Sequence, residues 1–177
     1  VEGHFGPIEI LSNSAAIFAS IRFKPFTELS NEEWDAVMRV NARGPFQATK
    51  AMLPSMQKNG RGKIINISSG TFLRGAPMFC HYVASKGAVV GQTRALSREL
   101  AASNVYVNCI MVGLTESEGV AESKQYDMAR SANQNMRAFQ RDMMPDDLLG
   151  TVYFLASEDS DFISGQCINV DGGALNY

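Results

Sequence analysis

The sequence predicts an open, layered α/β fold built on a parallel sheet. Apolar strand-like runs alternate with long helical segments along the chain. The run at 105–112 is rich in β-branched and apolar residues without clean alternation, which is typical of a parallel strand covered on both faces. The 177 residues contain no internal repeat or linker, so we expect a single domain.

The first elements are a strand and a long helix. Residues 8–18 form a short apolar run that leads into a turn of small residues. The helix is predicted to begin at Ser30, because Ser30 and Glu33 have the spacing of a capping box. It is predicted to end near Asn59-Gly60, a typical C-terminal cap.

Gly44-Pro45 interrupts the helical pattern. A proline has no N–H and repels the carbonyl four residues before it, which here belongs to Asn41. A simple kink is one interpretation. The other is that the Asn41 carbonyl stays free and, if buried, binds a water molecule.

The later elements continue the alternation. Strands are predicted at 63–68, 105–112 and 166–170, and helices at 82–101 and 145–156. Between the third strand and the last helix, a loop at 113–119 precedes a Met-rich polar segment that extends to about Met144. We expect this segment to form a helical flap or lid.

Composition excludes several classes of partner. The chain has 16 basic and 18 acidic residues and a formal charge of -2, which gives no electrostatic reason to expect nucleic acid or an anionic membrane. No apolar run is long enough to cross a bilayer, and no signal peptide is evident. The three cysteines, Cys80, Cys109 and Cys167, fit neither a disulfide framework nor a metal site, so a cytoplasmic location is expected.

A hydroxyl, a phenol and an ammonium can converge at one edge of the sheet. Ser69 follows a strand, while Tyr82 and Lys86 are four residues apart and share one helix face. Asn13 and the segment 113–117 also follow strand ends, where open α/β sheets bind ligands.

Such a set suits general acid–base chemistry on a carbonyl or alcohol oxygen. A tyrosine has a pKa near 10, and Lys86 with the helix N-terminus would lower the pKa of Tyr82. A decrease of about three units requires about 4 kcal/mol. Chance also supplies this spacing on many helices, and a serine after a strand is usually a turn residue. No G-x-S-x-G elbow is present, which disfavours a hydrolase.

Taken together, these residues resemble the short-chain dehydrogenase/reductase family. Ser69 precedes Tyr82 by the thirteen residues usual for the family, and Tyr82 to Lys86 match its Y-x-x-x-K motif. The resemblance extends over nearly the whole chain. Four other segments support it. Residues 34–44 match the Asn-bearing helix, and residues 13–16 match a variant of the Asn-Asn-Ala-Gly turn. Residues 154–157 and 163–173 match the C-terminal motifs.

The resemblance implies reversible hydride transfer between NAD or NADP and a small carbonyl/alcohol substrate. Tyr82 would be the acid/base, Ser69 would hold the substrate oxygen, Lys86 would bind the nicotinamide ribose and Asn41 would hold a water. It also implies a homodimer or homotetramer. The implied cofactor-binding residues are Asn13, Ala15, Ile67, Tyr82, Lys86, Gly113, Thr115 and Ser117. No metal is implied.

The implied fold is a three-layer, Rossmann-type parallel sheet with helices on both faces. Three features depart from the family: Val112-Gly113 replaces its Pro-Gly, its Asn-Asn-Ala-Gly turn is altered at two positions, and its G-x-x-x-G-x-G loop is absent. We therefore expect residues 1–177 to be one partial domain, truncated at the N-terminus and lacking the first βαβ units, with the first strand at a sheet edge.

The absent loop leaves a second hypothesis open. The chain would then be a catalytically inactive fragment or pseudoenzyme that acts as an assembly partner. An isomerase or dehydratase of the family's extended branch is disfavoured by the C-terminal motif. Within the family, the loop at 113–119 and the stretch 69–72 are most similar to bacterial pyridoxal 4-dehydrogenases and 3-oxoacyl reductases.

Overall fold

Four parallel strands form the central sheet of the computed structural model, which describes residues 2–176. Strands β1 (Ile10–Asn13), β2 (Gly62–Ser69), β3 (Val105–Val112) and β4 (Cys167–Val170) lie side by side in sequence order. Every neighbouring pair is parallel, so helices connect the strands. The predicted parallel α/β fold is therefore confirmed.

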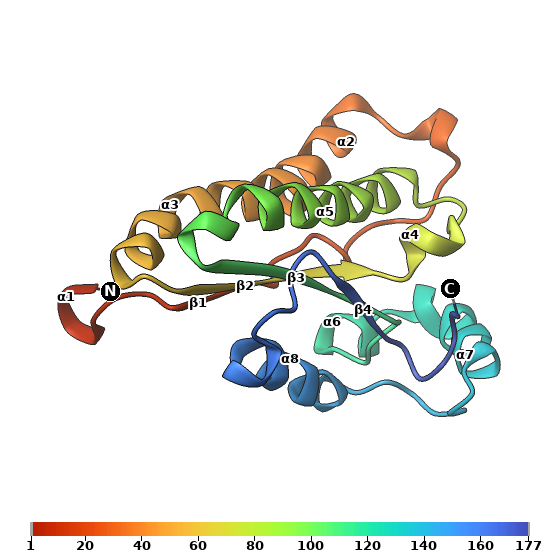
Figure 1. Ribbon diagram of the computed structural model, residues 1–177. Helices are drawn as coiled ribbons and strands as arrows, with labels where there is room; N and C mark the ends of the chain where they lie inside the picture. The colour runs from red at the N-terminus through yellow and green to blue at the C-terminus, as the bar shows by residue number, and fades with distance from the viewer. Residues whose placement is uncertain (1, 177) are drawn as a thin grey trace.

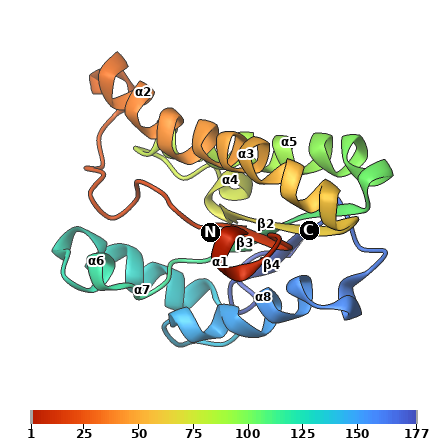
Figure 2. The same ribbon diagram turned by 90° about the vertical axis from the view of Figure 1, so that its left-hand side faces the viewer.

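Helices cover both faces of this sheet (Figures 1 and 2). One face carries α2 (Asn31–Met38), α3 (Gly44–Asn59) and α5 (Cys80–Glu99). The other face carries α6 (Glu118–Ala121), α7 (Asp127–Met136) and α8 (Leu149–Ala156). The predicted three layers are thus present, and the Met-rich flap is helical as expected. Two one-turn helices, α1 (Glu2–Phe5) and α4 (Thr71–Arg74), were not anticipated from the sequence.

The core lies on the two central strands. Ile64 and Val107 pack with Met56 of α3 on one face, whereas Ile65 and Ile110 pack with Leu155 of α8 on the other. Both strands are buried along nearly their whole length, as the unbroken apolar runs predict. Strand β1 is at the edge, and its Ile10 is 47% exposed.

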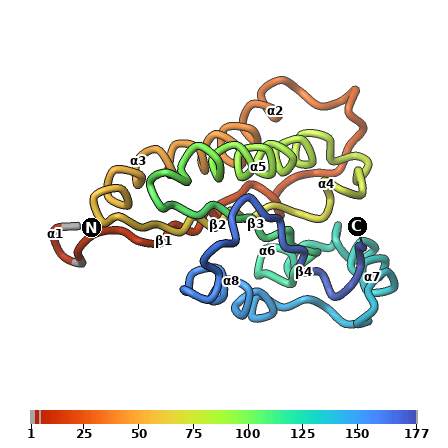
Figure 3. Tube along the Cα trace, in the orientation of Figure 1, coloured from red at the N-terminus to blue at the C-terminus, as the bar shows by residue number. Residues whose placement is uncertain are grey.

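Strand β1 is shorter than the predicted 8–18. Its pairing with β2 stops at Asn13, opposite Asn66. The chain then leaves the sheet, extends beyond the end of the strands and turns back into α2 (Figure 3). Residues 14–29 form this crossing segment, and its small residues after Asn13 lie beside a cavity at the carboxyl ends of the strands.

The helix that begins at Ser30 has the predicted capping box, with both reciprocal hydrogen bonds formed. It also ends as predicted, because Gly60 adopts a left-handed conformation with φ of 73°. The proline is accommodated by neither a simple kink nor a break. The helix widens into a π-helical turn at Arg39–Arg43, and Pro45 follows in the first turn of α3.

Three-residue and four-residue 3₁₀ turns complete the secondary structure. They lie at Phe26–Glu28, Ala101–Ser103, Lys124–Tyr126, Pro145–Leu148 and Glu158–Ser160. The Pro145–Leu148 turn leads directly into α8, so the helix predicted at 145–156 is present with a 3₁₀ start. Among the described residues, no helix is long and apolar enough to cross a membrane.

Candidate active site

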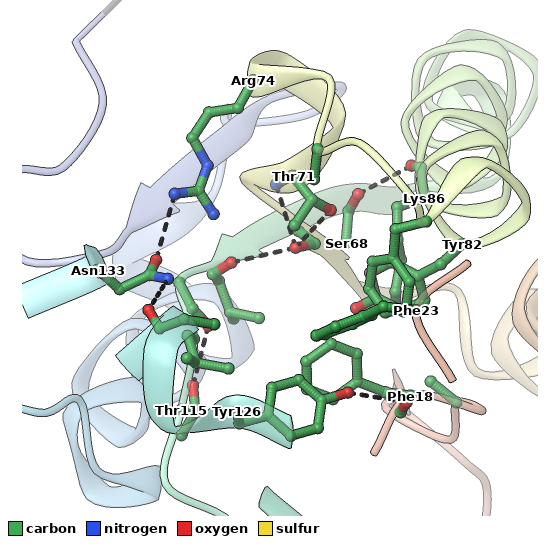
Figure 4. Close-up of a pocket in the computed structure, with 18 of the residues that line it drawn as sticks. Phe18, Phe23, Ser68, Thr71, Arg74, Tyr82, Lys86, Thr115, Tyr126 and Asn133 are labelled. Carbon is green, nitrogen blue, oxygen red and sulfur yellow. Dashed lines mark hydrogen bonds between the residues drawn. The ribbon is translucent and has the colours of Figure 1, made fainter. Parts of the chain in front are cut away.

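A cavity of about 650 Å³ lies at the carboxyl ends of the strands (Figure 4). Ser69 reaches it from the last position of β2, and Tyr82 and Lys86 reach it from the first two turns of α5. The two α5 residues share one helix face because they are four positions apart. The convergence predicted from the sequence is therefore present in the structure.

The Ser69 hydroxyl is held by the start of α4. It accepts hydrogen bonds from the Thr71 backbone N–H at 3.2 Å and from the Thr71 hydroxyl at 3.0 Å. Its own proton points toward the Val112 carbonyl at a long 3.5 Å. Because that bond is weak, the Ser69 hydroxyl can turn to donate to a substrate oxygen.

Tyr82 is almost completely buried, with 4% of its surface exposed. Its ring stacks on Phe79 at a centroid distance of 4.6 Å and contacts Phe18 at 5.1 Å. Burial raises the pKa of Tyr82 above its ordinary value, and the Ser69 hydroxyl lowers it by a smaller amount. This corrects the expectation that Lys86 and the helix N-terminus lower the pKa: in the apolar surroundings, desolvation of the phenolate is the larger effect.

The ammonium group of Lys86 is held by a backbone carbonyl. Its Nζ donates a hydrogen bond to the Ile67 carbonyl at 2.9 Å and lies 5.5 Å from the centroid of the Tyr82 ring. Burial lowers the pKa of Lys86 to about 8. The ammonium therefore titrates close to neutral pH, and two of its three N–H groups remain for other acceptors.

Asn41 is buried beside the site without lining the cavity. Its Oδ1 accepts from the Ile17 N–H at 2.7 Å, and its Nδ2 donates to the Ile17 carbonyl at 3.0 Å. Nδ2 also donates to the Ser85 hydroxyl at 3.2 Å, and Ser85 in turn donates to the Tyr82 carbonyl. The side chain thus fastens the crossing segment and the first turn of α5 to the π-helical turn. The free Asn41 carbonyl stays a prediction.

The residues expected to bind cofactor divide into two groups. Those that line the cavity are Ile67, Tyr82, Lys86, Gly113, Thr115 and Ser117. Asn13 and Ala15 do not line it. The Asn13 side chain instead donates to Asn66 Oδ1 at 2.8 Å within the sheet, and Ala15 is exposed. Their neighbours Ser14 and Ala16 line the cavity, because successive residues of an extended chain face opposite sides.

Sequence reasoning missed an aromatic wall. Phe18, Phe23, Phe79 and Tyr126 contact one another around Tyr82, with centroid distances from 5.1 to 5.9 Å. Their positions follow no helical or strand period, and only the folded crossing segment brings them together. The cluster of phenylalanines between 18 and 26 was the one available signal.

The flap is fastened over this wall by polar contacts. Gln125 donates to the carbonyls of Ala19 and Ile21 at 3.2 and 2.9 Å, and the Tyr126 hydroxyl donates to the Phe18 carbonyl. On the other side, Arg130 of α7 forms a 2.6 Å ion pair with Glu116. The flap therefore joins the crossing segment to the loop that carries Thr115 and Ser117.

The cavity suits the nicotinamide half of a dinucleotide. Lys86 supplies spare N–H donors, while Ser14, Thr115 and Ser117 supply hydroxyls in an otherwise apolar lining. Gly113 lets the loop pass closely: a Cβ there would lie 3.1 Å from the Cβ of Asp171 and 3.3 Å from Arg137 Nη2. Among the described residues, no group of three or more His, Cys, Asp or Glu side chains is placed to hold a metal ion.

Comparison with known proteins decides the family. A model of the enoyl-(acyl carrier protein) reductase family matches residues 1–175. The chain is also 34% identical over 171 residues to a 3-oxoacyl-(acyl-carrier-protein) reductase of Thermotoga maritima, covering 97% of this chain and 68% of that protein. This chain belongs to the short-chain dehydrogenase/reductase family. It is an oxidoreductase that acts on a CH–OH/C=O pair with NAD or NADP.

Solved structures of related dehydrogenases superpose closely on this chain. A gluconate 5-dehydrogenase from Burkholderia cenocepacia, in complex with NADP and tartrate, has a TM-score of 0.88 and 32% identity. A 4-hydroxyisoleucine dehydrogenase, in complex with NADH and succinate, has a TM-score of 0.82 and 27% identity. They cover 98% and 94% of this chain, which spans 67% of each of them. The Rossmann-type fold expected from the resemblance is therefore confirmed.

Proposed function

We propose that Tyr82 is the acid/base of this reductase and that Ser69 positions the substrate oxygen. The observation that supports this assignment is the meeting of Ser69, Tyr82 and Lys86 in one largely apolar cavity. Nicotinamide, when bound, supplies the hydride to the carbonyl carbon or takes it from the alcohol carbon. In reduction the Tyr82 hydroxyl gives its proton to the substrate oxygen, and in oxidation the phenolate takes it back.

The raised pKa of Tyr82 keeps the side chain a neutral phenol at neutral pH, which is the form that can give a proton. A neutral phenol in apolar surroundings is ready to donate to an oxygen that becomes an alkoxide. Ser69 donates a second hydrogen bond to the same oxygen and so stabilises the developing charge. We therefore propose that Tyr82 enters carbonyl reduction as the neutral phenol.

Lys86 is proposed to hold the nicotinamide ribose through its two spare N–H groups. The lining residues Ile67, Gly113, Thr115 and Ser117 complete this part of the site, with Ser14 and Ala16 beside them. Asn41 is proposed to hold a water of the proton relay through its backbone carbonyl. Its buried side chain keeps that carbonyl in place by anchoring Ile17 and Ser85.

The substrate is proposed to be a small 3-oxoacyl compound or its alcohol. This choice rests on the similarity to a 3-oxoacyl reductase and on the aromatic lining of the cavity.

We further propose that residues 1–177 form one partial Rossmann-type domain, and that the protein is a homodimer or homotetramer. A cytoplasmic location is proposed because the three cysteines are too few and too widely spaced for a disulfide framework. The second hypothesis, that the chain is a purely structural assembly partner, is not favoured, because the relatives that match nearly its whole length are oxidoreductases.

Turnover of methyl 3-oxobutanoate with NADH and with NADPH tests the proposal. Tyr82→Phe is expected to lower kcat by a factor of about 10² to 10⁴, the usual contribution of a positioned acid. Nicotinamide fluorescence is expected to show cofactor binding within about threefold of the wild type. Tyr153→Phe changes a phenol on α8 that is 69% exposed and serves as the matched control. Full turnover by Tyr82→Phe would refute the assignment.

A further inference from the structure

Arg74 is a cation in the wall of an otherwise largely apolar cavity. It stands at the end of α4, the single helical turn that follows Ser69. Thr71 and Arg74 are three positions apart, so they lie on the same side of this turn. Thr71 holds the Ser69 hydroxyl. Ser69, which is proposed to position the substrate oxygen, and Arg74 therefore belong to one short local structure.

The guanidinium of Arg74 is only partly satisfied. Its Nη1 donates to Asn133 Oδ1 at 3.2 Å and approaches the Met136 sulfur at 3.8 Å. Its Nε is buried without any hydrogen-bond partner, and no ion pair within residues 2–176 includes Arg74. A buried donor left without a partner is costly, which indicates that the site is completed by a further acceptor.

Neither Arg74 nor Arg137 forms an ion pair within residues 2–176. The Arg137 guanidinium repels that of Arg74, and the Asp171 carboxylate attracts it. The oxygens of Asp171 already accept from the Asn169 amide and from the N–H groups of Gly173 and Ala174. Arg137 donates from Nη1 and Nη2 to the carbonyls of Arg141 and Leu114, and its Nε, like that of Arg74, is buried without a partner. Arg74 alone of these charged groups lines the cavity.

Arg74 and Tyr82 lie on opposite sides of the cavity (Figure 4). A molecule that places its carbonyl oxygen at Tyr82 and Ser69 can therefore extend a second group toward Arg74. The Nε and Nη2 edge of a guanidinium is a planar fork that fits the two oxygens of a carboxylate. Neighbouring atoms cover Nε in this structure, so the side chain must turn slightly for both donors to reach one carboxylate.

We propose that Arg74 binds a carboxylate of the substrate, so that the preferred substrate is a free 3-oxo acid or its hydroxy acid. This inference rests on the proposed function, because it takes the carbonyl to lie at Tyr82 and Ser69. It assigns to Arg74 a role in specificity and none in the transfer of the proton. Asn133 and Met136 of the flap contact the same guanidinium, so a carboxylate that binds Arg74 changes the surroundings of these two flap residues.

Binding is tested with 3-oxobutanoate and its methyl ester, which differ in one negative charge. Protein labelled with ¹³C-methyl methionine is titrated with each compound, and the NMR signal of the Met136 methyl group reports binding. The signal that is lost in Met136→Leu is the signal of Met136. The wild type is expected to bind the acid at least about tenfold more tightly than the ester, as for a hydrogen-bonded charge. Arg74→Gln is expected to bring this ratio to about one, and Arg74→Lys to an intermediate value because it keeps the charge without the fork.

Arg98→Gln is the matched control for loss of one positive charge. Arg98 is an exposed residue in the last turn of α5, about 24 Å along the helix from Tyr82. It is expected to leave the acid-to-ester ratio unchanged. A wild-type ratio near one, or a ratio preserved in Arg74→Gln, would overturn the proposal. If Arg74→Gln fails to fold, an unchanged ratio in Arg74→Lys overturns it.

Two further outcomes separate this inference from the proposed function. Tyr82-dependent reduction of the ester without preference for the acid leaves the proposed function intact and overturns the carboxylate site. Tighter binding of inorganic phosphate than of 3-oxobutanoate at Met136 assigns Arg74 to a phosphate group and also overturns it. If neither compound is reduced, the proposed function fails, while the Arg74-dependent binding ratio still supports or refutes the carboxylate site.

Discussion

Asn41 forms both backbone hydrogen bonds of Ile17 with one side-chain amide, at 2.7 and 3.0 Å. Asn41 belongs to the π-helical turn before Pro45, and Ile17 belongs to the crossing segment that brings the aromatic wall to Tyr82. A single buried side chain therefore links the layer of helices to the cavity. The same amide reaches α5 through Ser85, one turn after Tyr82.

Replacing Asn41 by Ala is expected to lower the free energy of unfolding by about 2–4 kcal/mol. The substitution leaves the N–H and carbonyl of Ile17 without partners in a site where Asn41 is 1% exposed. Urea unfolding measures this change. Asn135→Ala, at an exposed position of α7, is the control and is expected to change stability by at most about 0.7 kcal/mol. A loss below about 1 kcal/mol in Asn41→Ala would contradict the anchoring role.

The sequence identified Asn41 through the proline four residues later, but it could not show what the side chain does. Proline patterns report on backbone hydrogen bonds, and they predicted an irregular helix at the correct place. They do not report on a partner that is 24 residues away, such as Ile17. The π-helical turn itself depends on tertiary packing, which buries Asn41 and Ala42 against the rest of the fold.

The pH dependence of stability tests the burial of Lys86. In the unfolded chain this lysine has a pKa near 10.5, whereas burial lowers it to about 8 in the folded protein. Between these values the unfolded state binds more protons, so stability rises as the pH increases. From about pH 7.5 to 9.5, the wild type is expected to gain about 2 kcal/mol relative to Lys86→Met.

Urea unfolding at several pH values provides this measurement. The range ends below pH 10, because burial raises the pKa values of Tyr82 and of Tyr126, the latter to about 12. Above pH 10, unfolded tyrosines lose protons that the folded protein keeps, and stability then falls as the pH increases. Parallel pH profiles for the wild type and Lys86→Met would show that Lys86 titrates normally.

Strands, caps and motif residues were predictable because they depend on local pattern. The unbroken apolar run at Val105–Val112 became a buried central strand with those bounds, and Ser30 and Glu33 formed their capping box. Ser69, Tyr82 and Lys86 were predictable because strand ends and helix faces bring them together. The pKa of Tyr82 and the positions of Phe18, Phe23 and Arg74 were not predictable, since each depends on how the crossing segment and flap pack around the cavity.

The ion pair between Glu116 and Arg130 tests whether the flap holds the loop at Thr115 and Ser117. Glu116 is 13% exposed in its side chain and accepts from Arg130 Nε at 2.6 Å. Glu116→Gln replaces a charged hydrogen bond by a neutral one, which is expected to cost about 1–2 kcal/mol. Amide hydrogen exchange over residues 113–120 is therefore expected to become about five to thirty times faster, because local opening becomes easier.

Asp127→Asn is the matched control because Asp127 pairs with the same arginine at 2.7 Å but is 64% exposed. An exposed pair within one helix contributes only about 0.3–0.5 kcal/mol, and Asp127 does not touch the loop. Exchange over residues 113–120 should therefore stay within about threefold of the wild type in this variant.

In kinetics, Glu116→Gln is expected to raise the KM for the nicotinamide cofactor more than it lowers kcat, because Thr115 and Ser117 lose their fixed position. Equal exchange rates in the two variants would show that the Glu116–Arg130 ion pair does not hold the loop, and the loop would then be held by the Thr115 pairing with Met143 at the end of the flap.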